Sequence, residues 1–219
     1  MAAAKGNTTN WFAIWISIAV VVVLVGLGGL VVFLNNMATA PGAAPKSDIV
    51  NEETGAISFG TGEDEVDTFV DFICPICGDF EDAYGEQLQA AAKSDEITLN
   101  IHPISILDRY STSEYSSRAA GSMYCVAESA PESALEYFNL LFENQPAEGS
   151  AGLSDDELAA LAEQAGAGAA ADCIADGTYM KYVVDQAKAH EIAGTPTVEI
   201  NGTRLENSQI AAELGKILG

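Results

Sequence analysis

Hydrophobic and polar positions divide the chain into one long uncharged run and a longer region of short alternating elements. The run covers residues 11–34 (WFAIWISIAVVVVLVGLGGLVVFL). A helix of this length, at about 1.5 Å per residue, crosses about 30 Å of hydrocarbon. Trp11, Phe12 and Trp15 gather at its start, as in an interfacial aromatic belt. We therefore predict a single transmembrane helix, with a cleaved signal peptide and a buried core helix as the alternatives.

The charges that flank the run predict its orientation. Lys5 is the basic residue before the run, and Lys46 is the first charge after it. This weak bias predicts a cytoplasmic tail at residues 1–10 and places the C-terminal part outside the cell, on a single-pass membrane protein. Residues 35–55 begin with a small, Pro- and Gly-containing stretch and are predicted to form a linker. Residues 56–219 then form one folded extracytoplasmic domain.

The first part of that domain alternates between strand and helix patterns. Residues 56–59 and 66–73 are predicted strands, because the second run in particular is rich in β-branched and aromatic residues. Residues 74–93 change to helical spacing, with one apolar face formed by Phe80, Tyr84, Leu88 and Ala91. Residues 97–106 return to a strand pattern, and Pro103 suggests a sheet edge or the end of that strand.

A long helical block follows at residues 111–190. Two capping boxes, Ser111-x-x-Glu114 and Ser154-x-x-Glu157, predict helix starts within it. Two short strands joined by an Asn-Gly turn and a final helix end the chain, at residues 197–200, 203–205 and 207–218. The predicted order is β-β-α-β, a helical block and β-β-α, which is an α/β fold.

Charge and composition narrow the classes of partner. The chain has 9 Lys and Arg against 32 Asp and Glu, a net charge of −23, and 48% of its residues are hydrophobic. That hydrophobic content suits a folded protein rather than a disordered one. The negative charge would repel a phosphate backbone, so nucleic acid is excluded as an expected partner. The acidic residues all lie from residue 48 onward and predict a solvated surface, with a cationic partner as the alternative.

The sequence Cys74-Pro75-Ile76-Cys77 lies where a predicted strand ends and a helix begins. A thiolate in the first turn of a helix faces free N–H groups and the positive end of the helix dipole, which lowers its pKa. We predict that Cys74 is an exposed nucleophile and that Cys77, one turn later, resolves the mixed disulfide. Pro75 suits the first turn because it lacks an N–H that the helix does not use. A zinc site or an inert disulfide would also use two such cysteines.

A second candidate segment, Gly194-Thr195-Pro196-Thr197, precedes the strand predicted at residues 197–200. A cis peptide at Thr195-Pro196 would expose the Thr195 backbone beside the cysteines, where a substrate could pair as an added strand. Asp71, three residues before Cys74, is a candidate proton acceptor for the buried thiol. A local hydrogen-bonding role for this carboxylate is equally compatible with its position. No spacing of His and Cys residues indicates a metal or cofactor site.

These motifs together resemble the thioredoxin superfamily, and more closely its DsbA-like branch, including membrane-anchored thiol-disulfide oxidoreductases of actinobacteria. The resemblance covers about residue 56 to the C-terminus. It rests on the segments Phe72-Ile73-Cys74-Pro75-Ile76-Cys77, Phe80-Glu81 and Gly194-Thr195-Pro196, and on the helical block between them. It implies a thioredoxin fold with a helical domain, residues 111–190, inserted between the two halves of the sheet.

The resemblance also implies roles for individual residues. Cys74 corresponds to the family's nucleophile and Cys77 to its resolving cysteine, while Thr195 and Pro196 correspond to its substrate-docking loop. Cys125 and Cys173 both lie in the helical block of an exported domain, and some relatives have a second bond there, so we predict a structural disulfide between them. Two buried free thiols are the alternative.

The family function would be the oxidation of exported, cysteine-containing proteins by a monomer that needs no cofactor and is reoxidised by a membrane redox partner. Three positions depart from the most oxidising members. Ile76 replaces a histidine between the cysteines, Thr68 replaces an acid six residues before Cys74, and Thr195 also occurs in reductase and isomerase relatives. A reductase, an isomerase, or a non-enzymatic binding module with a permanent Cys74–Cys77 bond therefore remain alternatives.

Overall fold

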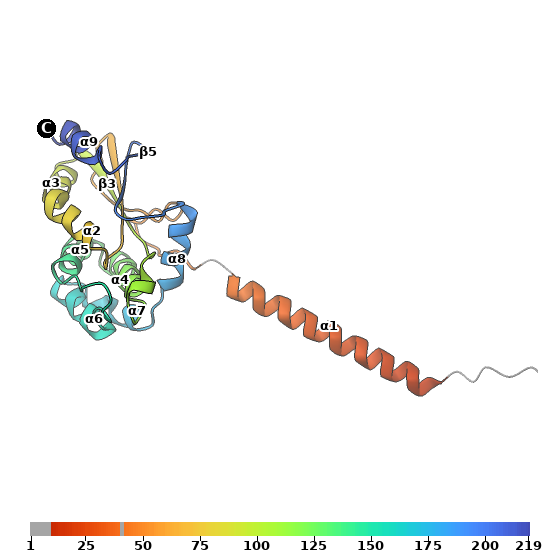
Figure 1. The fold of residues 1–219 in the computed structure, drawn as a ribbon. Coiled ribbons are helices and arrows are strands. Elements are labelled where there is room, and N and C mark those ends of the chain that lie inside the picture. The colour runs from red at the N-terminus through yellow and green to blue at the C-terminus, as the bar shows by residue number, and fades with distance from the viewer. Residues whose placement is uncertain (1–9, 40–41) are drawn as a thin grey trace, which may run out of the picture. The chain divides into compact units, whose positions relative to one another are not determined.

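The computed structural model describes residues 10–39 and 42–219, which fall into two units that divide after residue 40. The first unit contains helix α1, Trp11–Thr39 (Figure 1). Its segment Ile14–Asn35 has a mean hydropathy of 2.9 and is long and apolar enough to cross a membrane. The helix continues through residues 35–39, which were predicted as linker, because no helix breaker precedes Pro41. Most of the predicted tail, residues 1–9, lies outside the described residues.

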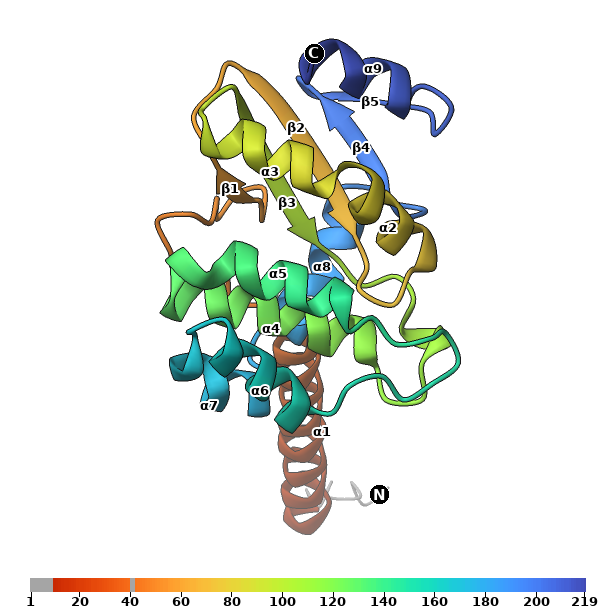
Figure 2. The same cartoon turned by 90° about the vertical axis from the view of Figure 1, so that its left-hand side faces the viewer.

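The second unit contains a five-stranded sheet of order β1-β3-β2-β4-β5 within the described residues (Figure 2). Its strands are β1 Ile57–Phe59, β2 Asp64–Val70, β3 Ile97–Pro103, β4 Thr197–Ile200 and β5 Thr203–Arg204. β2 pairs in parallel with β3 and antiparallel with β4, and the two outer pairs are antiparallel. Two segments that lie more than 120 residues apart in the chain therefore meet at the centre of one sheet, at β2 and β4.

The strand ends differ slightly from the sequence prediction. β2 ends at Val70 rather than at residue 73, because the Asp71 carboxylate accepts the Ile73 N–H at 3.2 Å and turns the chain out of the ladder. β3 ends at Pro103 and lies inside the sheet, between β1 and β2, so Pro103 marks the end of the strand rather than a sheet edge. A second, smaller apolar cluster contains Phe69, Ala187 and Ile192. It lies on the face of β2 opposite the main core.

The helix predicted at residues 74–93 is present in three consecutive segments. These are α2, Pro75–Phe80, a π-helical turn, Glu81–Gly85, and α3, Glu86–Lys93. α3 crosses one face of the sheet in Figure 2. The final helix, α9, spans Ile210–Ile217. The sheet, this helix and α9 form the thioredoxin part of the domain.

The helical block lies between β3 and β4, and so between the two halves of the sheet. Its helices are α4 Tyr115–Ser129, α5 Ala134–Glu143, α6 Asp155–Gln164, α7 Ala171–Ala175 and α8 Met180–Ala189. α4 is the buried centre of this insertion, with most of its side chains in the main hydrophobic core. A disulfide between Cys125 and Cys173, with a Cα–Cα distance of 5.7 Å, joins α4 to α7. The predicted fold class, an α/β thioredoxin fold with an inserted helical domain, is confirmed.

The two predicted capping boxes have different outcomes. Ser154 and Glu157 form the reciprocal box at the start of α6, as predicted. The box at Ser111 and Glu114 is wrong. Glu114 adopts a left-handed conformation with φ of +55° at the N-cap of α4, and its side chain makes no cap bond. Ser111 Oγ instead accepts the Tyr115 N–H at 2.8 Å, because the left-handed residue brings that amide within reach.

Candidate active site

Cys74 is the N-cap residue of α2, at the junction between the turn after β2 and the helix. Its own N–H donates to the Asp71 carbonyl at 3.0 Å, and its carbonyl accepts the N–H groups of Cys77 at 3.0 Å and Gly78 at 3.2 Å. Pro75 occupies the first helical turn, where its missing donor leaves no bond unmade. The local sequence therefore places both cysteines on the first turn of one helix.

The two cysteines are free thiols in different environments. The pKa of Cys74 is lowered to about 6, chiefly because the Cys77 thiol donates a hydrogen bond to its sulfur. The Thr195 side chain and the backbone N–H groups of Cys77 and Ile76 lower the pKa of Cys74 further, against the opposing effect of partial burial. Cys77 is fully buried, and Cys74 is also buried, with 5% of its surface exposed, so the prediction of an exposed Cys74 is wrong. Burial first, and then the neighbouring Cys74 sulfur, raise the pKa of Cys77 far above its ordinary value. Cys74 is thus a thiolate near neutral pH while Cys77 keeps its proton.

The Thr195–Pro196 peptide bond is cis, and it lies in the loop between α8 and β4. The Cys74 sulfur lies 3.4 Å from the Thr195 carbonyl oxygen, to which Cys74 donates when it is protonated. This contact joins residues 121 positions apart, and it forms because β4 pairs with β2 at the centre of the sheet. The loop that was predicted from the sequence to dock substrates therefore adjoins the sulfur of Cys74.

A cleft of about 630 Å³ opens beside these residues. It is bordered by the start of α2, the loop after β3 and the loop before β4. Its lining residues are Cys74, Pro75, Ile76, Ile106, Leu107, Arg109, Tyr110, Glu148, Ile192, Ala193, Gly194 and Thr195. Outside α1, the large hydrophobic side chains classed as exposed among the described residues are Ile76, at 60%, and Tyr110, at 43%. Both line this cleft, so the exposed apolar surface of the domain is concentrated at Cys74.

Asp71 lies under the cleft and is fully buried. Its carboxylate accepts the backbone N–H groups of Ile106 and Leu107, both at 3.0 Å, in addition to that of Ile73. Burial raises the pKa of Asp71 to about 6, against the opposing effect of its hydrogen bonds from the Ile106, Ile73 and Leu107 N–H groups. The contact with Cys77 is made by the Asp71 backbone N–H. The carboxylate therefore makes one local bond, to Ile73, and two bonds that hold the loop after β3 to the active-site turn. Its role as a proton acceptor stays a prediction.

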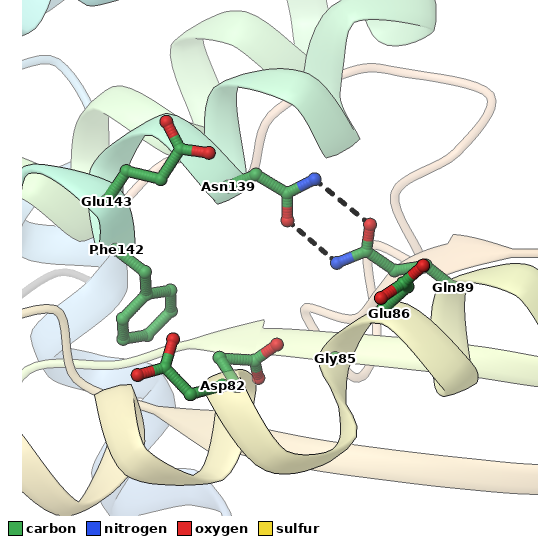
Figure 3. Close-up of a pocket in the computed structure, with 8 residues that line it drawn as sticks. Asp82, Gly85, Glu86, Gln89, Asn139, Phe142 and Glu143 are labelled. Carbon is green, nitrogen blue, oxygen red and sulfur yellow. Dashed lines mark hydrogen bonds between the residues drawn. The ribbon is translucent and has the colours of Figure 1, made fainter.

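A second, smaller pocket of about 250 Å³ lies between the π-helical turn, α3 and α5 (Figure 3). Gln89 on α3 and Asn139 on α5 exchange amide hydrogen bonds across it, at 2.8 and 3.0 Å. Glu81 also lines this pocket, and burial first and the Asp82 charge second raise the pKa of Glu81 to about 8. The lining of this pocket does not include either active-site cysteine, so it is separate from the cleft.

Sequence reasoning missed one residue that contacts the active-site turn. Gln145, which follows α5, donates from Nε2 to the carbonyl oxygens of Cys74 at 2.9 Å and of Phe72 at 3.2 Å. No local pattern signals this contact, because Gln145 lies 71 residues after Cys74 on a different part of the fold. Nor does the sequence signal Tyr110 and Arg109, which enter the cleft from the short 3-10 turn after β3.

Comparisons with known proteins agree with this geometry. The thioredoxin family model matches residues 60–219. The structure resembles that of oxidised DsbA from Mycobacterium tuberculosis, with 32% sequence identity and a TM-score of 0.67, over 75% of this chain and 93% of that one. It also resembles the reduced disulfide bond oxidoreductase DsbG from the same organism, with 34% identity and a TM-score of 0.67, over 74% of this chain and 85% of that one.

A curated relative of a different overall kind matches the same region. The chain is 31% identical over 167 residues to the serine/threonine-protein kinase PknE of Mycobacterium tuberculosis. The match covers 70% of this chain and 29% of the kinase. The chain therefore spans less than a third of the length of this curated relative.

Proposed function

We propose that this chain, which belongs to the DsbA-like thiol-disulfide oxidoreductases of the thioredoxin superfamily, is a membrane-anchored oxidase that introduces disulfides into exported proteins. The observation that carries the proposal is the asymmetry of the two cysteines. Cys74 lies at a cleft with its pKa lowered to about 6, whereas Cys77 is buried with its pKa strongly raised. A thiol of low pKa is a good leaving group, so a substrate disulfide is readily released from Cys74.

The reaction starts from the Cys74–Cys77 disulfide. A substrate thiolate attacks Cys74 Sγ, the bond between Cys74 and Cys77 breaks, and the electron pair leaves on the Cys77 sulfur, which takes up a proton. A second substrate thiolate then attacks the substrate sulfur of the mixed disulfide and releases Cys74 as a thiolate. The substrate loses two electrons and gains one disulfide, and the enzyme is left as the dithiol. A membrane redox partner that accepts two electrons would restore the Cys74–Cys77 bond.

The cleft suits an extended segment of an unfolded protein. The Thr195 carbonyl adjoins Cys74 and can accept an N–H from a substrate strand, which is the β-augmentation mode of peptide recognition. Ile76 and Tyr110 offer exposed apolar surface in the cleft that Cys74 lines, and the Arg109 guanidinium packs over the Tyr110 ring at 4.8 Å. Backbone pairing with little side-chain selection would let one monomer act on many cysteine-containing exported proteins.

The proposed location follows from α1. Its apolar segment has the length and composition of a membrane span, and the thiol-disulfide exchange proposed here requires a compartment in which disulfides persist. The chain would thus act at the outer face of the cell membrane, tethered by its own helix. A cleaved signal sequence would leave the same domain free in that compartment.

A reductase or isomerase is the second candidate, and a specific observation favours it. Ile76, between the cysteines, contributes to the low pKa of Cys74 through its backbone N–H, and its apolar side chain cannot add a charge or a hydrogen bond to the thiolate. The thiolate is thus stabilised less than it would be with an ionisable side chain at this position. A less stabilised thiolate corresponds to a more reducing couple.

The redox equilibrium of the full-length protein in detergent with glutathione buffers tests the direction. The state of Cys74 and Cys77 is read by alkylation and mass, with Cys125→Ser/Cys173→Ser as a control that isolates this pair. A potential of about −120 to −180 mV supports the oxidase, and one below about −230 mV indicates a reductase. A pair that never reduces, or a Cys74→Ser variant that retains thiol oxidation of a reduced substrate protein, contradicts both.

A further inference from the structure

Gln145 connects the helical insertion to the turn that carries the nucleophile. Its backbone N–H bonds to the Phe142 carbonyl at 3.0 Å, which fixes it at the end of α5. Its side-chain amide then reaches the Phe72 and Cys74 carbonyl oxygens. These two carbonyl groups lie before and after the Ile73–Cys74 peptide bond. One side chain therefore holds the backbone on both sides of that peptide bond.

The space around this amide is shaped by a glycine. A Cβ atom added to Gly78, on α2, would lie 2.5 Å from Gln145 Oε1. The Gly78 N–H also donates to the Cys74 carbonyl, the same oxygen that accepts from Gln145. A residue without a side chain at this position therefore lets the Gln145 amide lie against the first turn of the active-site helix.

Aromatic packing supports the same contact. The Phe72 ring lies 5.0 Å from that of Phe142 and 5.8 Å from that of Phe138, both on α5. The end of α5 is thus packed onto the active-site turn, and Gln145 adds a directional hydrogen bond to this apolar contact. Gln145 is partly buried, which favours a stable hydrogen-bond geometry over exchange with solvent.

We propose that Gln145 is a positioning residue that holds the Cys74 backbone and thereby sets the reactivity of the Cys74 thiolate. The groups that stabilise the thiolate come from Cys77, Thr195 and the first helical turn, so their distances to the sulfur depend on how the Cys74 backbone is held. An N–H that donates to the Cys74 carbonyl also draws electron density from the residue that carries the negative sulfur. The inference rests on the thiol chemistry of the proposed function, but it holds for either direction of electron flow.

Gln145→Met tests this with a side chain of similar length that cannot donate. The readout is the pH dependence of the alkylation rate of Cys74 in the reduced full-length protein, alongside the thermal unfolding temperature. We expect the midpoint of the Cys74 alkylation profile to rise by about half a pH unit. A shift of this size corresponds to the net free energy of one weak hydrogen bond. The alkylation rate at pH 6 falls correspondingly by about two- to threefold.

Gly78→Ala is an independent route to the same effect, because the added methyl group displaces the amide without removing it. Alanine is a better helix former than glycine, so this variant favours α2 while it moves Gln145. We expect the alkylation midpoint of Gly78→Ala to rise as in Gln145→Met, and the double variant to show about the same rise rather than the sum.

Gln89→Met is the matched control. It breaks the amide pair with Asn139, which joins α3 to α5 in the pocket of Figure 3 and lies apart from the cleft lining. We expect a lower unfolding temperature and an unchanged alkylation midpoint. A Gln145→Met midpoint equal to that of the unmodified protein, or a Gln89→Met midpoint that rises as much, overturns the positioning role. An unmodified Cys74 that titrates at the ordinary value for cysteine overturns the proposed function as well, which distinguishes the two failures.

Discussion

The domain contains two cysteine pairs that differ in spacing, bonding state and reactivity. Cys125 and Cys173 lie 48 residues apart, on α4 and α7, and are joined as a disulfide within the helical insertion. Cys74 and Cys77 lie on one helical turn and are free thiols. Burial alone does not separate the pairs, since Cys125 and Cys77 are both almost completely buried. Reactivity instead requires a sulfur that borders a cleft and receives hydrogen bonds, as that of Cys74 does.

The helical insertion and the active-site region also differ in how the ionisation of their buried polar groups affects the stability of the fold. In the active-site turn and in the helical segment that follows it, burial raises the pKa values of Asp71, Cys77 and Glu81, so ionising either carboxyl group opposes folding. In the insertion, the groups with raised pKa values include Tyr115 and Tyr137, which are uncharged at neutral pH in any case. These tyrosines of the insertion therefore stay neutral at no electrostatic cost, whereas the buried carboxyl groups of the active-site region lower stability when the pH favours their ionisation.

Removal of the insertion's disulfide tests this division most strongly. In the chain-entropy model, opening a loop of this length lowers the free energy of unfolding by up to about 4 kcal/mol. We expect Cys125→Ser/Cys173→Ser to lose stability on that scale in urea denaturation, and its rate of thiol-disulfide exchange to change by less than about twofold. An exchange rate that falls with stability intact would place the second pair in the redox reaction and remove the distinction.

Glu81→Gln tests the cost carried by the active-site region. Burial raises the pKa of Glu81 from about 4.5 to about 8, so folding favours the protonated acid. Its contribution to stability is complete below pH 4.5 and is lost as the pH rises through 8. We therefore expect Glu81→Gln to raise the free energy of unfolding by about 1 to 3 kcal/mol at pH 8 and by much less at pH 5, in urea denaturation.

Glu86→Gln is the control for this variant, because Glu86 lines the same pocket but is exposed. Its stability should not change between the two pH values relative to the unmodified protein. Equal pH dependence in the two variants would show that the overall negative charge, rather than the burial of Glu81, is responsible.

Thr195→Val gives the smallest expected effect and concerns the active pair alone. The pKa of Cys74 is lowered to about 6 chiefly by the Cys77 thiol, and the Thr195 side chain lowers it further. Loss of this hydroxyl should raise the midpoint of Cys74 alkylation by about half a pH unit. Thr197→Val serves as the control, because the Thr197 hydroxyl donates to the Gly194 carbonyl in the same loop. If both variants shift the midpoint alike, loop geometry and not the hydroxyl bond sets the pKa.

Several elements could be predicted because their signals are local. The apolar run predicted α1, the β-branched run predicted β2, and Ser154-x-x-Glu157 predicted the start of α6. The box at Ser111 failed because a left-handed Glu114, which four-residue spacing does not reveal, moved the helix start to Tyr115. Asp71 could be singled out from its position three residues before Cys74, but the bonds of its carboxylate to Ile106 and Leu107 depend on a loop more than 30 residues away.

The sequence by itself determined that two cysteines lie on the first turn of a helix and that an apolar helix precedes the domain. It also determined the family to which the chain belongs. Periodicity and capping act over a few residues, so the printed order of amino acids contains them. The sequence predicted that the Thr195 backbone would lie beside the cysteines, but only the tertiary structure brought the Gln145 amide to the Cys74 carbonyl and the Asp71 carboxylate to the loop after β3. These contacts join residues that are far apart in the chain, and burial and hydrogen bonding between them set the pKa values on which the chemistry depends.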